Sequence, residues 1–171
     1  MFKLNFFTPI SREALENLIA ATTHLPLDTP IQINMASSGG NVQIGMQMYN
    51  YLKRFSNLTI KAMGNIDSIA VIVFLAASSR IATDNSLFFL HGITLDSNGP
   101  ISLRTKDLDD YKDKLTHEIS RYSNIFAKAT AKADKPISLG DIRLILEGHG
   151  DRTLTTTEAL LTGILSSIVS T

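Results

Sequence analysis

The stretch that decides the fold is KAMGNIDSIAVIVFLAASS, residues 61–79. Its second half, residues 69–77, holds only apolar and small side chains, which is typical of a helix buried on every side. Ser68 stands at the start of this helix, four residues after Gly64. Two interpretations are open. Ser68 is an N-cap whose hydroxyl accepts a free backbone N–H, or it is a nucleophile held where backbone donors face an oxyanion.

Strand-like and helix-like segments alternate on both sides of this stretch, by apolar periodicity and turn residues. This alternation predicts an α/β fold with a largely parallel sheet. The expected elements are a strand at 2–7, a helix capped by Ser11, a strand at 30–35, a helix at about 42–55, a strand at 58–64, the helix after Ser68 and two strands within 80–92.

The second half of the chain begins with a turn-rich segment at 94–103, followed by a long polar helix expected at about 104–133. One narrow apolar stripe on a charged helix is typical of an arm that packs against another subunit. Beyond it, two capping boxes predict short helices, and a last strand is expected at 164–169. The stripe consists of Leu108, Tyr111, Leu115, Ile119, Tyr122, Phe126 and Ala129. The capping boxes pair Ser138 with Asp141 and Thr155 with Glu158.

Composition narrows the class of protein. The 171 residues carry 16 Lys plus Arg against 16 Asp plus Glu, so no basic surface for nucleic acid or anionic membrane is expected. The chain has no cysteine, which excludes disulfides, thiolate metal sites and a Cys nucleophile. Its N-terminus lacks the apolar core of a signal peptide, and its longest apolar stretch is about half of a membrane span. We therefore expect a single domain, residues 1–171, in the cytoplasm.

The segment SSGGN, residues 37–41, lies between an expected strand and an expected helix. Paired glycines there let backbone N–H groups approach a ligand closely. The segment matches neither the phosphate loop nor the dinucleotide fingerprint, so a plain strand–helix turn is the alternative.

The four histidines differ in their surroundings. His24 follows an expected helix and His117 lies on the charged face of the long helix, so both are expected to be solvated. His91 ends the apolar run LFFL, and His149 lies between two glycines, two residues before Asp151. No spacing of these histidines indicates a metal site.

A Ser–His–Asp set would explain several of these features together. A serine hydroxyl is a poor nucleophile until an imidazole takes its proton, and a carboxylate must fix the tautomer of that imidazole. The oxyanion that forms needs preorganised N–H donors, which a Gly-rich turn beside the serine can supply. Geometry and not chain order defines such a triad, so spacing alone leaves the assignment open.

Three segments in order, residues 33–52, 63–92 and 150–168, resemble the motifs of the Clp protease proteolytic subunit family. They read INMASSGGNVQIGMQMYNYL, MGNIDSIAVIVFLAASSRIATDNSLFFLHG and GDRTLTTTEALLTGILSSI. The resemblance implies a serine peptidase with a crotonase-like fold of repeated ββα units. It also implies a protruding handle helix, with the handle region at about 94–135.

Carried over residue by residue, the resemblance makes Ser68 the nucleophile, His91 the general base and Asp151 the carboxylate that orients the base. The N–H groups of Gly40 and Ile69 would form the oxyanion hole. Peptides or unfolded proteins would be the substrates, and no metal or other cofactor is implied. The family's assembly implies a homo-oligomeric ring, as a heptamer or as stacked rings.

The chain also departs from the family's pattern. The family's segment before the first strand, which contacts an ATP-dependent unfoldase, is missing here, so an unfoldase partner is an open question. Ser38 replaces a proline before the glycine pair, and Gly92 with Ile93 replaces Gln-Pro after the histidine. Asp67 replaces a small residue before the nucleophile, and if it lay near His91 its charge would favour the imidazolium.

Two other functions fit the same sequence. The chain could be a catalytically silent subunit that serves as a structural or partner member of a ring. A crotonase-type acyl-CoA enzyme shares the expected fold and an oxyanion hole, but it would not require Ser68, His91 and Asp151 together.

Overall fold

A computed structural model of the chain describes residues 1–94 and 104–170. The described residues form a seven-stranded sheet whose main path runs β1-β2-β3-β4-β7, with every neighbouring pair parallel. The elements are β1 (Phe2–Phe7), α1 (Arg12–Thr22), β2 (Ile31–Ser37), α2 (Val42–Leu52), β3 (Leu58–Asp67), α3 (Ile69–Phe74), β4 (Ser79–Thr83), β5 (Leu87–Leu90), α4 (Thr105–Thr130), α5 (Leu139–Leu146), β6 (Arg152–Thr155), α6 (Thr156–Leu161) and β7 (Ser167–Val169).

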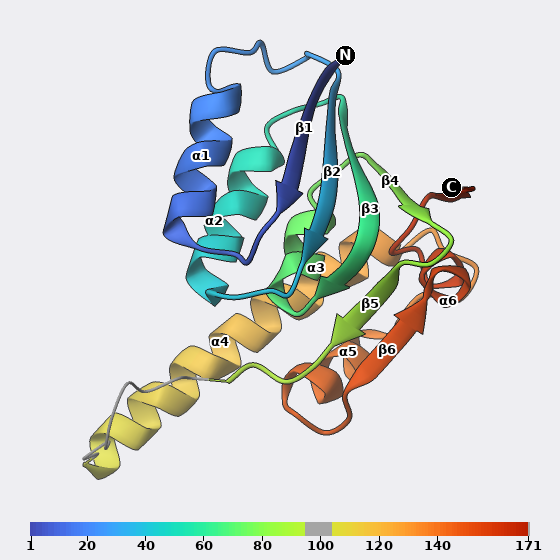
Figure 1. Cartoon of the computed structure of the whole chain (residues 1–171). Coiled ribbons are helices and arrows are strands. Elements are labelled where there is room, and N and C mark those ends of the chain that lie inside the picture. The colour runs from blue at the N-terminus through green and yellow to red at the C-terminus, as the bar shows by residue number, and fades with distance from the viewer. Residues whose placement is uncertain (95–103, 171) are drawn as a thin grey trace.

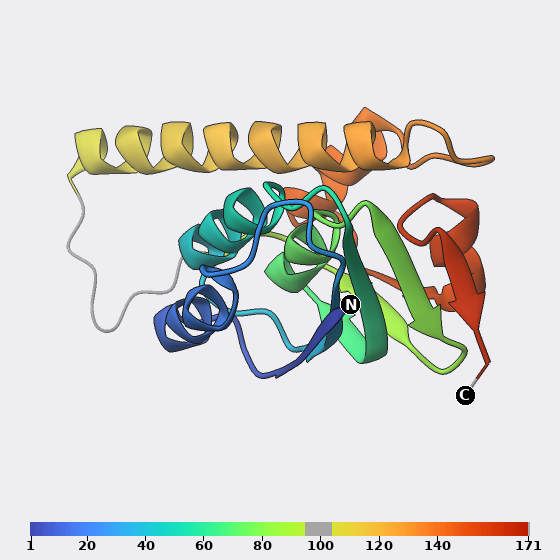
Figure 2. The same ribbon diagram turned by 90° about the horizontal axis from the view of Figure 1, so that it is seen from above.

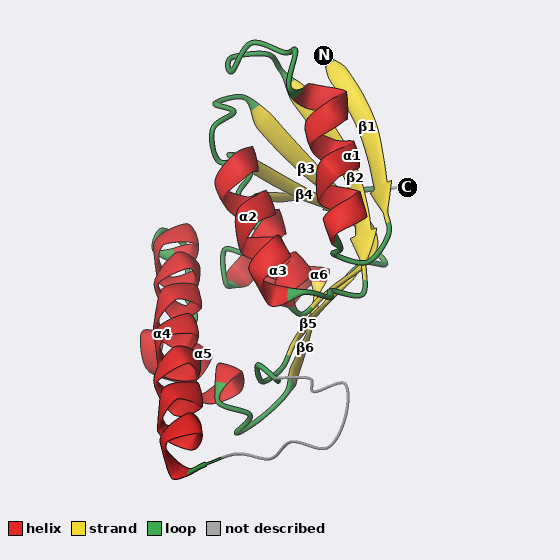
Figure 3. Cartoon of the chain, turned by 90° about the vertical axis from the view of Figure 1, so that its left-hand side faces the viewer, coloured by secondary structure: helices red, strands yellow, loops and turns green. Residues whose placement is uncertain are grey.

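Helices α1, α2 and α3 cover one face of this sheet, as Figures 1 and 3 show. The alternation of β2 explains the arrangement, because Ile31, Ile33 and Met35 are buried while the residues between them are only partly covered. On the face without helices, Asn34 donates a hydrogen bond to Asn5 on the neighbouring strand. The predicted α/β fold with a mainly parallel sheet is therefore confirmed.

Strand β3 runs three residues beyond its predicted end and delivers the chain directly to Ser68. Its first half pairs with β4, while its end pairs with β5, so the two strands within 80–92 do not form a hairpin. β5 in turn pairs antiparallel with β6, a strand that the sequence did not predict. These pairings bring the ends of β3 and β5 side by side.

The long helix α4 forms a separate layer and extends past the body of the molecule (Figures 1 and 2). Its apolar stripe divides in two: Ile119, Tyr122 and Phe126 are buried, whereas Leu108 and Tyr111 are exposed. The second half of the helix therefore packs within its own subunit, and the first half presents apolar side chains outward. Of the turn-rich segment expected at 94–103, all but Thr94 lies outside the described residues.

Arg80 at the start of β4 ties α4 to the body. Its guanidinium donates hydrogen bonds to the carbonyls of Ala77, Ala129, Gly163 and Ile164, at 2.8–3.1 Å. These carbonyls belong to the segments that end or follow α3, α4 and α6, where backbone acceptors lack helical partners. Arg80 therefore fixes the part of α4 that stands over α3.

The capping predictions hold. Ser138 accepts a hydrogen bond from the N–H of Asp141, and Thr155 forms a reciprocal box with Glu158. The last strand is shorter than expected, because β7 spans Ser167–Val169 only. Helix α3 is shorter too, although every residue from 69 to 77 is buried as predicted.

Candidate active site

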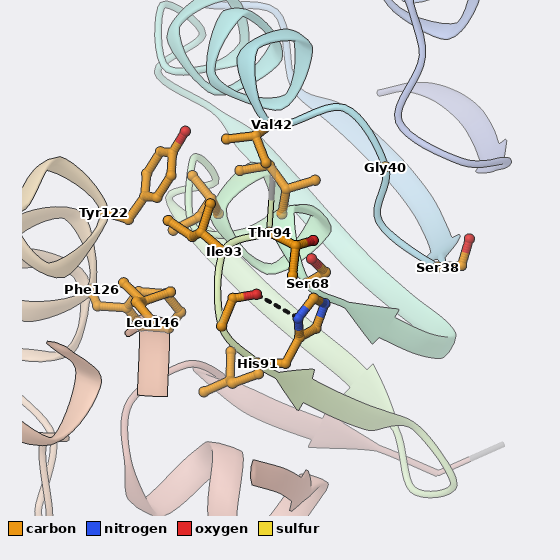
Figure 4. Close-up of a pocket in the computed structure, with 14 residues that line it drawn as sticks. Ser38, Gly40, Val42, Ser68, His91, Ile93, Thr94, Tyr122, Phe126 and Leu146 are labelled. Atoms are coloured by element: carbon orange, nitrogen blue, oxygen red, sulfur yellow. Dashed lines mark hydrogen bonds between the residues drawn. The ribbon is translucent and has the colours of Figure 1, made fainter. Parts of the chain in front are cut away.

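A pocket of about 210 Å³ opens where β2, β3 and β5 end, and α4 forms its far wall (Figure 4). Parallel strands bring their carboxyl ends to one edge of the sheet, which is where open α/β sheets bind ligands. Four of the five residues assigned to the site from the resemblance line this pocket: Gly40, Ser68, Ile69 and His91.

Ser68 has the backbone conformation of a strained turn. At φ 57° and ψ −131°, it is the one non-glycine residue with positive φ among those the structure describes. Its N–H donates to the carbonyl of Phe89 at 2.7 Å, which locks the turn to β5. Its hydroxyl makes no capping hydrogen bond to α3, so the N-cap interpretation fails. A costly conformation that leaves a hydroxyl free fits a functional serine.

The glycine turn before α2 packs tightly around this serine. Gly39 has φ 82°, and a Cβ there would come 2.7 Å from the Cβ of Ser68. Gly40 has φ 143°, and a Cβ there would come 2.5 Å from the carbonyl oxygen of Ile10. Gly45 on α2 contacts the side chain of Ile69 just as closely. Side chains at these positions would push the turn away from the nucleophile.

The same turn leaves the N–H of Gly40 available. Ile10 donates to the carbonyl of Gly39 at 2.7 Å and accepts from the N–H of Asn41 at 3.0 Å. In such a parallel bridge the bonds to Ile10 come from the residues flanking Gly40. The N–H of Gly40 therefore points away from Ile10, while that of Ile69 is among the unpaired donors of the first turn of α3. Both residues border the pocket that contains Ser68.

His91 lies beside Ser68 (Figure 4). The His91 ring is held from two sides. Its Nδ1 is 2.7 Å from the carbonyl oxygen of Gly92, and its ring centroid is 5.3 Å from that of Phe89. A carbonyl oxygen only accepts, so Nδ1 carries the proton and Nε2 is left as the acceptor. Nε2 is therefore available to accept a proton.

Gly92 permits a close approach that explains one departure from the family's pattern. A Cβ on Gly92 would come 2.8 Å from the Cα of Gly148. The next residue, Ile93, donates to the carbonyl of Leu146 at 3.0 Å, which pins this segment to the end of α5. The Gln-Pro of the family could not take this path.

Asp151, the fifth assigned residue, lies at the edge of the site. It precedes Arg152, which pairs with Leu90, so it occupies the next position opposite His91. Its side chain is exposed and makes no hydrogen bond to any residue that the structure describes. It does not line the pocket. The structure therefore brings Asp151 near His91 in the backbone but leaves the carboxylate outside the pocket.

Asp67 is half-buried at the end of β3, immediately before Ser68. Burial raises the pKa of its carboxyl group from the ordinary 3.8, and the charge of His91 acts in the opposite direction. The strand register places Asp67 opposite Phe89, whose ring lies against that of His91.

The sequence analysis missed the α4 wall of the pocket. Tyr122 and Phe126 were assigned to a stripe facing another subunit, but they close this site together with Leu146. Burial is also the main cause of the raised pKa of the Tyr122 hydroxyl. Helical spacing alone does not reveal which part of a stripe packs internally.

Within the two described ranges, no cluster of three or more His, Asp or Glu side chains could hold a metal ion. No helix there has the length and apolarity needed to cross a membrane.

Comparison with known proteins agrees with this geometry. The family model for Clp protease matches residues 4–171. The chain belongs to the Clp protease family. Its fold is therefore the crotonase-like fold of Clp protease, and the family supports a serine peptidase in general. The comparison with curated proteins found no match.

Proposed function

We propose that this Clp protease family member is a serine endopeptidase that hydrolyses short or unfolded polypeptides. The observation that carries the proposal is the state of Ser68. Its hydroxyl does not cap α3, its backbone forms a strained turn, and it lies beside the imidazole of His91, whose Nδ1 is held by the carbonyl of Gly92. Among the described residues, no hydrogen bond accounts for the position of the Ser68 hydroxyl, whereas a role in nucleophilic attack does.

In this mechanism, Nε2 of His91 takes the proton of the Ser68 hydroxyl as the oxygen attacks the substrate carbonyl. The N–H groups of Gly40 and Ile69 stabilise the oxyanion of the tetrahedral intermediate. The imidazolium then protonates the leaving amine, and an acyl-enzyme forms on Ser68. Water, deprotonated by His91, hydrolyses the acyl-enzyme and restores the serine.

Asp151 is the proposed triad carboxylate, because it occupies the position opposite His91 on the chain that continues into β6. A carboxylate there would stabilise the imidazolium when it forms. Contact between Asp151 and His91 requires the Asp151 side chain to turn inward from solvent. The carbonyl of Gly92 already supplies the acceptor that fixes the tautomer.

The proposed form is a homo-oligomeric ring in the cytoplasm, with one peptidase domain in each subunit. The exposed stripe of Leu108 and Tyr111 supports self-association, since both residues belong to the first half of α4, the half that extends past the body (Figure 2). An ATP-dependent unfoldase is the proposed partner for folded substrates, while short peptides need none.

The test is hydrolysis of fluorogenic peptides and of unfolded casein by wild type, Ser68→Ala and Ser56→Ala. Ser56 is exposed at the opposite end of the sheet and serves as the matched control. We expect turnover by wild type and the control, and a loss of roughly 10⁴-fold or more for Ser68→Ala. Equal rates for wild type and Ser68→Ala would refute the proposal.

A second candidate is the catalytically silent ring subunit. The exposed side chain of Asp151, outside the pocket, is the observation that favours it. An assembled wild-type protein that hydrolyses neither substrate would support this alternative over the peptidase.

A further inference from the structure

Asp67 and His91 lie on the same side of the sheet, at its carboxyl edge. Asp67 pairs with Phe89 in the parallel register of β3 and β5. Paired residues of neighbouring strands point to the same face. The ring of His91 in turn lies against that of Phe89, with centroids 5.3 Å apart and planes at 31°. The carboxylate, the phenyl ring and the imidazole therefore lie on one face of the sheet, and Asp67 immediately precedes Ser68.

The carboxylate of Asp67 has no structural partner among the described residues. It is half-buried, yet it makes no hydrogen bond and no ion pair with any of them. Burial disfavours its charged form, and the opposing influence is the charge of His91. A half-buried carboxylate whose charge is disfavoured by burial, and which no hydrogen bond compensates, indicates a functional role.

Besides Asp67, the buried hydroxyl of Tyr122 on α4 lines the same pocket as His91, and burial raises its pKa so that it stays neutral. The charged side chains at this end of the neighbouring elements are paired or exposed. Glu118 and Arg121 on α4 pair with each other, and the charge of Arg152 acts on Glu158. Other charged or titratable side chains on α5 and in the segment before β6 are exposed. They include Asp141, Arg143, Glu147, His149 and Asp151.

We propose that Asp67 is a positioning residue whose negative charge stabilises the imidazolium form of His91. The consequence for catalysis rests on the proposed function. When His91 takes the proton of Ser68, a positive charge develops on the imidazole, and a neighbouring carboxylate lowers the free energy of that state. Asp67 acts through space, while the Gly92 carbonyl holds the ring by a hydrogen bond.

The direct test is an NMR titration of the four imidazoles in wild type and in Asp67→Asn, which removes the charge and keeps the shape. The His91 resonance is assigned by its loss in His91→Gln. We expect the titration midpoint of His91 to move to lower pH, because removing a neighbouring negative charge disfavours the imidazolium. Asp67→Glu, which keeps the charge, should restore at least half of the shift.

The matched control is Asp28→Asn, an exposed aspartate in the loop before β2, at the other end of the sheet. It removes the same charge and should leave the His91 midpoint in place. An unchanged midpoint in folded Asp67→Asn would overturn the proposal. So would an equal shift in Asp28→Asn, since the effect would then be one of net charge.

A second readout separates this proposal from the peptidase itself. Labelling of Ser68 by a fluorophosphonate requires neutral His91, so the labelling rate falls at acidic pH. The pH at which the rate falls should be lower in Asp67→Asn than in wild type. Wild type that is never labelled, at any pH, would contradict the peptidase. The imidazole titration would still decide the role of Asp67.

Discussion

Gly39 lies directly against Ser68. A Cβ on Gly39 would come 2.7 Å from the Cβ of Ser68 and 2.9 Å from the carbonyl oxygen of Asp67. The turn that carries the expected oxyanion donor and the turn that carries the nucleophile are therefore packed without room for a methyl group. Because of this contact, any side chain at Gly39 would displace one of the two turns.

Gly39→Ala should consequently damage the site more than the fold. Its φ of 82° is costly for alanine, so we expect a loss of about 1–2 kcal/mol in the free energy of unfolding. A displacement of the turn by an ångström should lower the labelling rate of Ser68 roughly 10²-fold. Denaturant unfolding and fluorophosphonate kinetics measure the two effects.

The control for this variant is Gly140→Ala in α5. A Cβ there would meet only the Ser138 hydroxyl oxygen, at an ordinary 3.7 Å. The labelling rate should stay at the wild-type value, and stability should not fall, because alanine favours a helix. Equal losses of labelling in the two glycine variants would show that the contact with Ser68 is not what matters.

The exposed half of the α4 stripe should mediate assembly. Tyr111→Glu places a charge in the apolar stripe, so light scattering should report a lower mass than for wild type. Lys106→Gln changes the net charge by the same amount on the opposite side of the helix, and it should leave the mass unchanged. A wild-type mass for Tyr111→Glu would instead mean that Tyr111 contacts no other subunit.

Asp67 should lower stability at neutral pH. Its pKa is raised in the folded state, so folding favours the protonated carboxyl, and stability falls as pH rises through that pKa. Asp67→Asn should therefore raise Tm at pH 7. The gain should vanish below the ordinary carboxyl pKa of 3.8. Thermal unfolding at pH 7 and at about pH 3 tests the sign, and a lower Tm for the variant at pH 7 would contradict it.

Local sequence patterns predicted most of the secondary structure correctly. The parallel α/β arrangement, the buried segment after Ser68 and the caps at Ser138 and Thr155 follow from apolar runs and capping residues. The pairing of Ser68 with His91 in one pocket was expected from the resemblance. The helices, strands and caps depend on short-range sequence, where periodicity and capping motifs are informative.

Features that depend on distant contacts were missed. β6 is a strand of only four residues, RTLT. Nothing in these four residues indicates that they pair with β5. The role of Gly92 depends on Gly148, more than fifty residues away. Tyr122 and Phe126 share their helical spacing with Tyr111, and only the packing of α4 on the body separates buried from exposed positions.

The most direct test of the account is the intact-protein mass after incubation with a fluorophosphonate, for wild type, Ser68→Ala and His91→Ala. An activated serine predicts one adduct on wild type and none on either variant, because the label requires both the Ser68 hydroxyl and its base. A folded, assembled wild type that gains no adduct would contradict the account, as would an adduct that persists on Ser68→Ala.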